Sequence, residues 1–204
     1  MERNYASVII NTLRNKLLNT PMDKINVADI CRDANISRQS FYYHFTGIND
    51  CLYQMFLDDF NEFRNKIPEI TKLNSIRELL DQFYSYVYNN QKIIKNIFAA
   101  SEKVVFFNYL YNTMMAYIRR TIPKFVPEAQ LLPYDDLNYI IEFYISCFLT
   151  SIINWVNKDF STTPDFEAVH FQIITAGSLR DWVRKFIEFN RRKAITTANG
   201  EKGN

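Results

Sequence analysis

The chain contains few of the residues that break helices or shape tight loops. Only four of its 204 residues are glycine and six are proline, whereas 48% are hydrophobic. No glycine-rich phosphate loop is present, and polar and apolar residues do not alternate in a strand-like way over any length. This composition predicts an all-α globular protein.

Cysteine and histidine are also scarce. Cys31, Cys51 and Cys147 are widely spaced and odd in number, which argues against a disulfide framework or a metal-ligand cluster and favours a reducing cytoplasmic location. His44 and His170 fall in different halves of the chain, so we expect neither a metal site nor a histidine-based catalytic pair. Because no nucleophile motif or carboxylate pair accompanies them, the sequence predicts no enzyme and no cofactor.

The chain has no uncharged apolar run of the ~20 residues that a membrane span needs. The nearest candidate, residues 137–156, is interrupted by Glu142 and Asn154, so we expect a buried helix there and no membrane partner. The N-terminus leads straight into an amphipathic pattern, so no signal peptide is expected.

The most informative stretch is residues 26–56. Val27, Ile30, Cys31 and Ala34 are spaced as one apolar face of a short helix, and Asn26 is a suitable N-cap for it. The pattern then breaks and resumes in a second apolar face, which predicts two short helices joined by a tight turn.

The second half of this stretch explains how the turn would be made. Asn35 tolerates the left-handed backbone conformation that such a turn needs, and Ser37 can cap a helix over residues 38–44. Phe41 and Phe45 would point back toward the first helix. The result is a helix-turn-helix with a polar, aromatic outer face.

The residues from Val27 to Ile30, from Asn35 to Ser37 and from Phe41 to Phe45 resemble the DNA-binding domain of the TetR/AcrR family of bacterial transcriptional regulators. The resemblance covers the first quarter to third of the chain. It implies about nine helices, a homodimer, operator binding by the N-terminal domain and ligand sensing by the C-terminal one. The pattern departs from the family at Asn35, where glycine is usual, and at residues 46–50, which lack a lysine that many members place against a phosphate.

Net charge contributes little to this assignment. The chain has a formal charge of +2, and residues 1–48 hold six lysines and arginines against four acids. Many nucleic-acid-binding proteins are more basic. The domains expected from the resemblance are a helix-turn-helix domain (1–47), an effector-binding and dimerisation domain (48–193) and a mobile tail (194–204).

The outer face of the second short helix is the predicted DNA-binding site. Arg38 can pair bidentately with guanine and Gln39 with adenine, and helix N-termini can add phosphate contacts. The resemblance implies phosphate contacts for the hydroxyls and His44. The complete predicted set is Ser37, Arg38, Gln39, Ser40, Tyr42, Tyr43 and His44. The alternative is a solvated helix face in a motif that no longer binds DNA.

Hydrophobic periodicity predicts further helices along the whole chain. A helix over residues 48–66 would link the DNA-binding unit to everything downstream. The other expected elements are helices over 5–18, 75–88, 91–98, 104–122 (ended by Pro123 and Pro127), 135–158 and from Thr163 to about Arg191, with a loop over 124–134.

Aromatic residues are abundant in the middle of the C-terminal domain, which suggests a pocket for an apolar or aromatic small molecule. The alternative is an ordinary core. The predicted lining residues are Phe83, Tyr86, Phe107, Tyr111, Met114, Tyr144 and Phe148.

Two features indicate a surface for a second copy of the chain. A narrow polar stripe runs along the 135–158 helix, and small residues precede a large apolar stripe in the last helix. The resemblance implies that the last two helices form a four-helix dimer interface; the alternative is packing within one subunit. The predicted interface residues are Ser146, Thr150, Asn154, Ala176, Gly177, Leu179 and Trp182.

Together these observations predict a ligand-responsive, DNA-binding transcriptional regulator that binds a palindromic operator as a homodimer in the bacterial cytoplasm, at the nucleoid. Repression is the commoner role in the family. One alternative is an interaction protein or coactivator of the same fold that has lost operator binding and partners another regulator. Another is an α-helical enzyme using the aromatic pocket, for which Glu142 and His170 are the available titratable groups.

Overall fold

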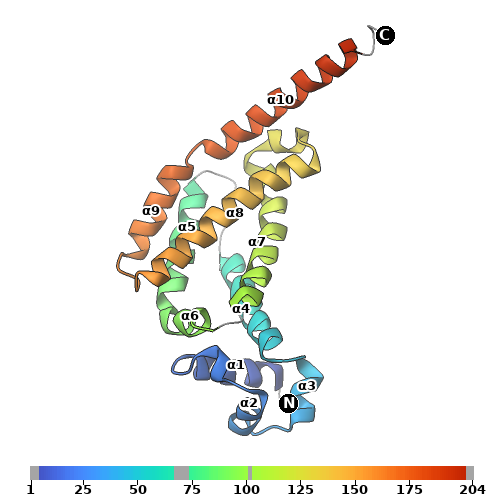
Figure 1. Cartoon of the computed structure of the whole chain (residues 1–204). Helices are drawn as coiled ribbons and strands as arrows, with labels where there is room; N and C mark the ends of the chain where they lie inside the picture. Colours follow the sequence, from blue (N-terminus) through green and yellow to red (C-terminus); the bar gives the residue numbers. More distant parts are fainter. Residues whose placement is uncertain (1–4, 67–73, 101–102, 201–204) are drawn as a thin grey trace. The chain divides into compact units, whose positions relative to one another are not determined.

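A computed structural model describes residues 5–66, 74–100 and 103–200 of the chain (Figure 1). Within these ranges it is all-α, as predicted, and contains no strand. The elements in chain order are α1 (Tyr5–Leu17), the 3₁₀ helix η1 (Met22–Lys24), α2 (Val27–Ala34), α3 (Arg38–His44), α4 (Ile48–Lys66), α5 (Asn74–Asn89), α6 (Gln91–Phe98), α7 (Lys103–Phe125), the 3₁₀ helix η2 (Pro127–Leu131), α8 (Tyr134–Asn157), α9 (Pro164–Thr175) and α10 (Ser178–Gly200).

The described residues form two compact units. Unit 1 takes in those of 1–68, 85–113 and 156–161, and unit 2 those of 69–84, 114–155 and 162–204. Helices α5, α7 and α8 contribute residues to both. The predicted domain boundary at residue 47 is a division by function, and it stays a prediction.

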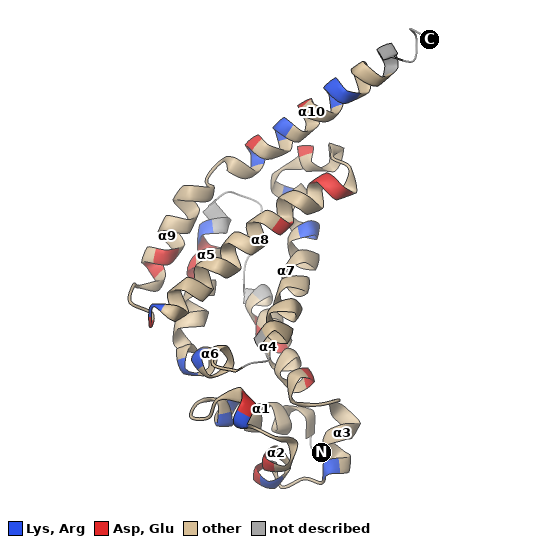
Figure 2. Cartoon of the chain, viewed as in Figure 1, with Lys and Arg blue, Asp and Glu red and all other residues tan. Residues whose placement is uncertain are grey.

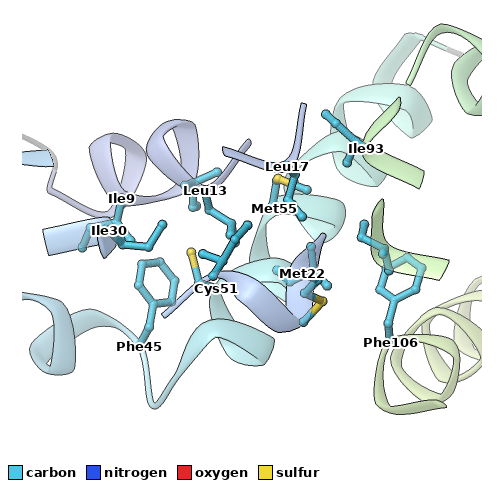
Figure 3. Close-up of a cluster of buried hydrophobic side chains, with 14 of the residues drawn as sticks. Ile9, Leu13, Leu17, Met22, Ile30, Phe45, Cys51, Met55, Ile93 and Phe106 are labelled. Atoms are coloured by element: carbon cyan, nitrogen blue, oxygen red, sulfur yellow. The ribbon is translucent and has the colours of Figure 1, made fainter. Parts of the chain in front are cut away.

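The core of unit 1 joins the helix-turn-helix to helices that come later in the chain. Ile9 and Leu13 of α1 are fully buried, together with Met55 of α4. Ile93 of α6 and Phe106 of α7 belong to the same cluster, which Figure 3 shows. Burying a side chain of this kind stabilises the fold by about 1.5–3 kcal/mol. The helix-turn-helix therefore owes part of its stability to α6 and α7.

The core of unit 2 is built around α8. Ile140, Ile141 and Trp155 are almost completely buried on one side of this helix, and Tyr84 of α5 packs edge-on against Trp155. Among the described helices, α8 alone is long and apolar enough to cross a membrane, and 44% of its apolar window is buried. The buried residues form a core face, in line with the buried helix that the sequence predicts.

The expected single helix from Thr163 to Arg191 was wrong, because the chain breaks between α9 and α10. Ala176 has an extended backbone (ψ 124°), and Gly177 adopts a left-handed φ of 75°, which glycine accepts without steric penalty. The Ser178 hydroxyl donates to the Thr175 carbonyl across the break at 2.7 Å. α10 then continues to Gly200, beyond the start of the predicted mobile tail, whose last residues 201–204 lie outside the described ranges.

Two smaller expectations at the end of α7 were also wrong. Pro123 lies inside α7 and does not end it. Proline removes one amide donor and crowds the carbonyl four residues earlier, but the amides after it can still donate, and Val126 donates to the Ile122 carbonyl at 2.9 Å. The expected loop over 124–134 contains the 3₁₀ helix η2.

Candidate nucleic-acid interface

Local capping determines where α2 begins and ends. The Asn26 side chain accepts a hydrogen bond from the Asp29 amide at 3.0 Å, as the sequence predicts for an N-cap. At the other end Asn35 has φ 53° and ψ 52°, which is the left-handed conformation expected of it. The Ile36 amide then donates to the Cys31 carbonyl at 3.0 Å and closes the turn.

Helix α3 is fixed in the same way at its start and by burial along its back. The Ser37 hydroxyl accepts from the Ser40 amide at 3.0 Å. Phe41 is fully buried and Phe45 nearly so, with their ring centroids 6.0 Å apart. Because both rings lie in the core of unit 1, the orientation of this short helix is set by packing, and its opposite face is turned to solvent.

The residues predicted to bind DNA occupy that solvent face. Ser37, Arg38 and Gln39 are exposed, and Ser40 and His44 are half-buried. Tyr42 and Tyr43 are the extreme cases, with 57% and 84% of their surfaces exposed. Two large aromatic side chains with so much exposure have little role in stabilising the protomer, and they are available for contact with another molecule.

The cations of the motif differ in whether a carboxylate neutralises them. Arg32 of α2 pairs with Asp29 at 2.8 Å, and Lys16 of α1 pairs with Asp33 at 2.5 Å. The hydrogen bond from Lys16 holds the pKa of Asp33 below its ordinary value. By contrast, Arg38 has no ion pair within the described ranges. Figure 2 shows acids and bases side by side on α2, whereas α3 carries a basic residue and no acid.

An acid stands at the start of α4, near the place where many family members have a lysine. One oxygen of Asp50 accepts from both the amide and the hydroxyl of Thr46, at 2.8 Å and 3.1 Å. This arrangement caps the helix internally. It leaves no basic side chain at this helix N-terminus, although the amides of the first turn remain.

Similarity to known proteins identifies the family to which the chain belongs. A model described as the C-terminal region of transcriptional regulators of the TetR type matches residues 74–177, about half of the chain. This match lies outside the helix-turn-helix and so supports the resemblance independently of it. The chain belongs to the TetR family of transcriptional regulators. Proteins of this family are generally not enzymes; they bind DNA, form dimers and respond to small molecules.

Solved structures extend the likeness of this TetR-family protein over nearly its whole length. The dihydroxyacetone kinase operon activator DhaS is 16% identical, with a TM-score of 0.61 over 90% of this chain and 98% of its own. A TetR-family regulator from Streptomyces coelicolor is 11% identical, with a TM-score of 0.61 over 98% and 99%. NalD, the secondary repressor of the MexAB-OprM multidrug efflux pump in Pseudomonas aeruginosa, is 13% identical, with a TM-score of 0.59 over 84% and 94%. At these identities the likeness shows the fold alone. No curated protein matches significantly.

The residues predicted to line an effector pocket are divided between the two units. Tyr86, Phe107 and Tyr111 belong to unit 1, and Phe83, Met114, Tyr144 and Phe148 to unit 2. In unit 2 the rings of Phe83 and Phe148 pack edge-on, 4.9 Å apart. In unit 1 Tyr86 donates its hydroxyl to Asp59. The seven residues are thus shared between the two units, and the pocket stays a prediction.

The residues predicted at a dimer interface lie on α8, on α10 and at the break before α10. Ser146, Thr150 and Asn154 are exposed along one stripe of α8, while Trp182 of α10 packs on Phe143 of α8 with ring centroids 4.7 Å apart. Ala176 and Gly177 are exposed, and Leu179 is half-buried. Ala176 and Gly177 form the break itself, so the expectation that they lie within one long helix was wrong, and their place at an interface stays a prediction.

Proposed function

We propose that this chain is a homodimeric operator-binding regulator whose α3 enters the major groove of DNA. The observation that carries the proposal is the two-sided character of α3. Its back is anchored by buried Phe41, and its front presents Arg38 without a carboxylate partner in the described ranges, beside two exposed tyrosines. Such a face offers a cation and several hydroxyl groups to a phosphate-lined groove.

Position along α3 divides the roles of these residues. Arg38 and Gln39 lie in the first turn, and in helix-turn-helix proteins this end of the recognition helix meets base edges. We assign base contacts to these two. Ser37, Ser40, Tyr42, Tyr43 and His44 are assigned to phosphates, which fix the register of the helix in the groove without reading sequence.

A second copy of the chain is proposed to pack against α8 and α10. On the exposed side of α8, Tyr139 and Phe143 stand beside the small residues Ser146, Cys147 and Thr150. Small side chains let two helices approach closely, and the exposed rings need cover. A two-fold axis through this face would present two copies of α3 to a palindromic operator with half-sites about one helical turn apart.

Regulation by an apolar or aromatic small molecule is supported by the family and by the abundance of aromatic residues in the part of the chain that follows the helix-turn-helix. Such an effector would act by preferring a dimer whose two α3 helices do not match the operator spacing. We propose repression as the role and the cytoplasm, at the nucleoid, as the location. Both an activator and a repressor share the fold, so the sign of regulation needs its own measurement.

The decisive experiment is selection of bound fragments from random duplex DNA with the purified full-length protein. A regulator of this kind recovers an inverted repeat, and the symmetry of the recovered sequence also tests the dimer. Recovery of unrelated fragments, or of a single half-site, would contradict the proposal.

A second candidate is an interaction protein of the same fold. It is favoured by Asp50, which occupies the start of α4 and caps it internally, and by the ion pairs that neutralise Arg32 and Lys16. A salt titration separates the two functions, because displacement of counterions from phosphates makes DNA affinity fall steeply with salt. An absence of duplex binding at low salt would favour the interaction protein.

A further inference from the structure

Three helices of unit 1 meet at the carboxylate of Asp59 on α4. Arg14 of α1 donates from Nη2 to one carboxylate oxygen at 2.6 Å. Tyr86 of α5 donates its hydroxyl to the other oxygen at 2.5 Å. The three residues are separated by 45 and 27 positions in the chain, so this Arg14–Asp59–Tyr86 network is made by tertiary packing alone.

The network is partly removed from water. The side chains of Arg14 and Asp59 are 28% and 17% exposed. Burial alone would lower the pKa of Arg14, but the hydrogen bond and charge of Asp59 outweigh it and raise that pKa. Burial, reinforced by the Asp59 charge, also raises the pKa of Tyr86. At neutral pH Arg14 is therefore a guanidinium and Tyr86 a neutral phenol, so both can donate a hydrogen bond to Asp59.

Stability alone is a poor explanation for such a network. A buried ion pair often contributes no more stability than apolar residues of the same volume. What it adds is geometry, since a hydrogen bond fails when donor and acceptor separate beyond about 3.5 Å or lose alignment. The neighbouring apolar contacts, such as Phe56 with Tyr86 at a centroid distance of 6.5 Å, tolerate sliding much better.

Each partner of Asp59 lies on a helix with a second task. α1 carries Ile9 and Leu13 into the core that also holds Ile30 of α2 and Phe41 of α3. α5 carries Tyr84, two residues before Tyr86, into the aromatic core of unit 2, where its hydroxyl meets Ser151 at 2.7 Å. A shift of α5 along its axis by about 1 Å would lengthen the Tyr86 bond to the limit of a hydrogen bond.

We propose that Arg14, Asp59 and Tyr86 are positioning residues that hold the α1–α3 reading unit at one orientation on α4 and α5, and so set the half-site spacing that the dimer accepts. The inference rests on the proposed operator binding. In this proposal Tyr86 does not line a pocket. Its hydroxyl transmits a movement of α5 to α1 through the hydrogen bonds to Asp59.

The test compares two operators, the selected one and the same sequence with one base pair inserted between its half-sites. The inserted pair moves the second half-site along and around the duplex. We expect the full-length wild-type protein to prefer the selected operator strongly. In Tyr86→Phe this preference should fall at least threefold, because a loosened reading unit adapts to the altered spacing. Asp59→Asn should lower it further, and Arg14→Lys, which retains the cation, should lower it less than Arg14→Met.

Tyr84→Phe is the matched control. It removes a tyrosine hydroxyl from the same helix that also makes one hydrogen bond, but that bond links α5 to α8 and not to α1. Its spacing preference should equal that of the wild type even if its melting temperature falls. If Tyr86→Phe instead lost affinity for both operators in equal proportion, its preference would be unchanged. The network would then have only a structural role, and the inference would be overturned.

A measurement without DNA distinguishes failure of this inference from failure of the proposed operator binding. Spin labels on Asp23→Cys, an exposed site in η1, in a Cys147→Ser background report the distance between the two reading units of a dimer. The distance distribution should be narrow with the native network and broader in Tyr86→Phe, whether or not duplex selection succeeds. Identical distributions would overturn the inference, whereas a failed selection with a broadened distribution would count against operator binding alone.

Discussion

Two exposed faces within the described residues differ in chemistry. The face of α3 presents Arg38, Gln39 and the phenols of Tyr42 and Tyr43, all of which can donate hydrogen bonds. The face of α8 and α10 presents rings and small side chains, with Phe143 packed on Trp182. A hydrated, charged surface fits a nucleic acid, and an apolar one fits a second protein surface that excludes water.

The two faces are also supported in different ways. α3 has only seven residues, and its direction depends on the Ser37 cap and on buried Phe41 and Phe45. α8 has 24 residues and is held along its whole length by buried isoleucines and Trp155. A short helix on a shared core can be reoriented by its neighbours, whereas a long core helix makes a stable platform. Regulation by orientation is therefore expected at α3 and permanent association at α8.

The largest effect is expected from a charge placed in the apolar face. Phe143→Glu would put a carboxylate against a second copy of α8 and α10, so the dimer should dissociate and operator affinity should fall by about 100-fold or more. Sedimentation velocity measures the first effect and DNA binding the second. Phe166→Glu on α9 is the control, because its ring is exposed to a similar degree, 44% against 47% for Phe143. A Phe143→Glu protein that stays dimeric would place the interface elsewhere.

Removal of one cation from the polar face should have the next largest effect. Arg38→Ala should weaken binding of the selected operator by about 1–3 kcal/mol and relax the preference at one base pair, if Arg38 contacts a base. Affinity measured against operators substituted at each position shows which pair is affected. Lys24→Ala removes another exposed cation without an ion pair in the described ranges, and it should change no base preference. A uniform loss across all operators would make Arg38 a phosphate contact.

The local parts of the fold were predictable because their causes lie within a few residues. The capping of α2 by Asn26, of α3 by Ser37 and of α9 by Thr163, and the left-handed conformation of Asn35, all follow from side chains acting on amides three positions away or on their own backbone. The break at Gly177 was missed because apolar residues on both sides continue with helical spacing. A single glycine in a helical pattern is often tolerated.

The long-range parts of the site were not predictable from one sequence. Asp59 was counted only as part of a helix, because nothing in its neighbourhood identifies Arg14 or Tyr86 as partners. Tyr86 was grouped with Phe83 and Phe148 for its aromatic character. Those two residues belong to unit 2, however, whereas Tyr86 and its hydrogen-bond partner Asp59 belong to unit 1. Composition can indicate that a region is rich in aromatic residues. It cannot show which of them belong to which core when one helix contributes residues to two cores.

A smaller effect is expected at the turn that aims the polar face. Asn35 has φ 53°, so Asn35→Ala should destabilise the protein by about 1 kcal/mol, because alanine is strained in the left-handed region. Asn35→Gly should be within about 0.5 kcal/mol of the wild type, since glycine relieves strain but gains freedom in the unfolded chain. Urea denaturation measures both. Equal losses in the two variants would mean that the Asn35 side chain, and not its backbone conformation, stabilises the turn.

The mildest test leaves the chain unaltered and uses its three thiols to distinguish the faces. Cys147 is exposed on α8, whereas Cys31 and Cys51 are buried in unit 1. Burial raises the pKa of Cys51 to about 12, so this thiol stays protonated and unreactive at pH 8. Its contribution to the free energy of unfolding is complete below a pH of about 8.5, the pKa of a thiol in the unfolded chain, and it decreases as the pH rises above that value. At pH 8 Cys147 alone should react quickly with an alkylating reagent in dilute protein, and more slowly as rising concentration drives the dimer. Sedimentation shows the range of protein concentration over which the dimer forms. If the alkylation rate of Cys147 does not change across that range, this stretch of α8 is not in the interface, and the interface must be formed by α10.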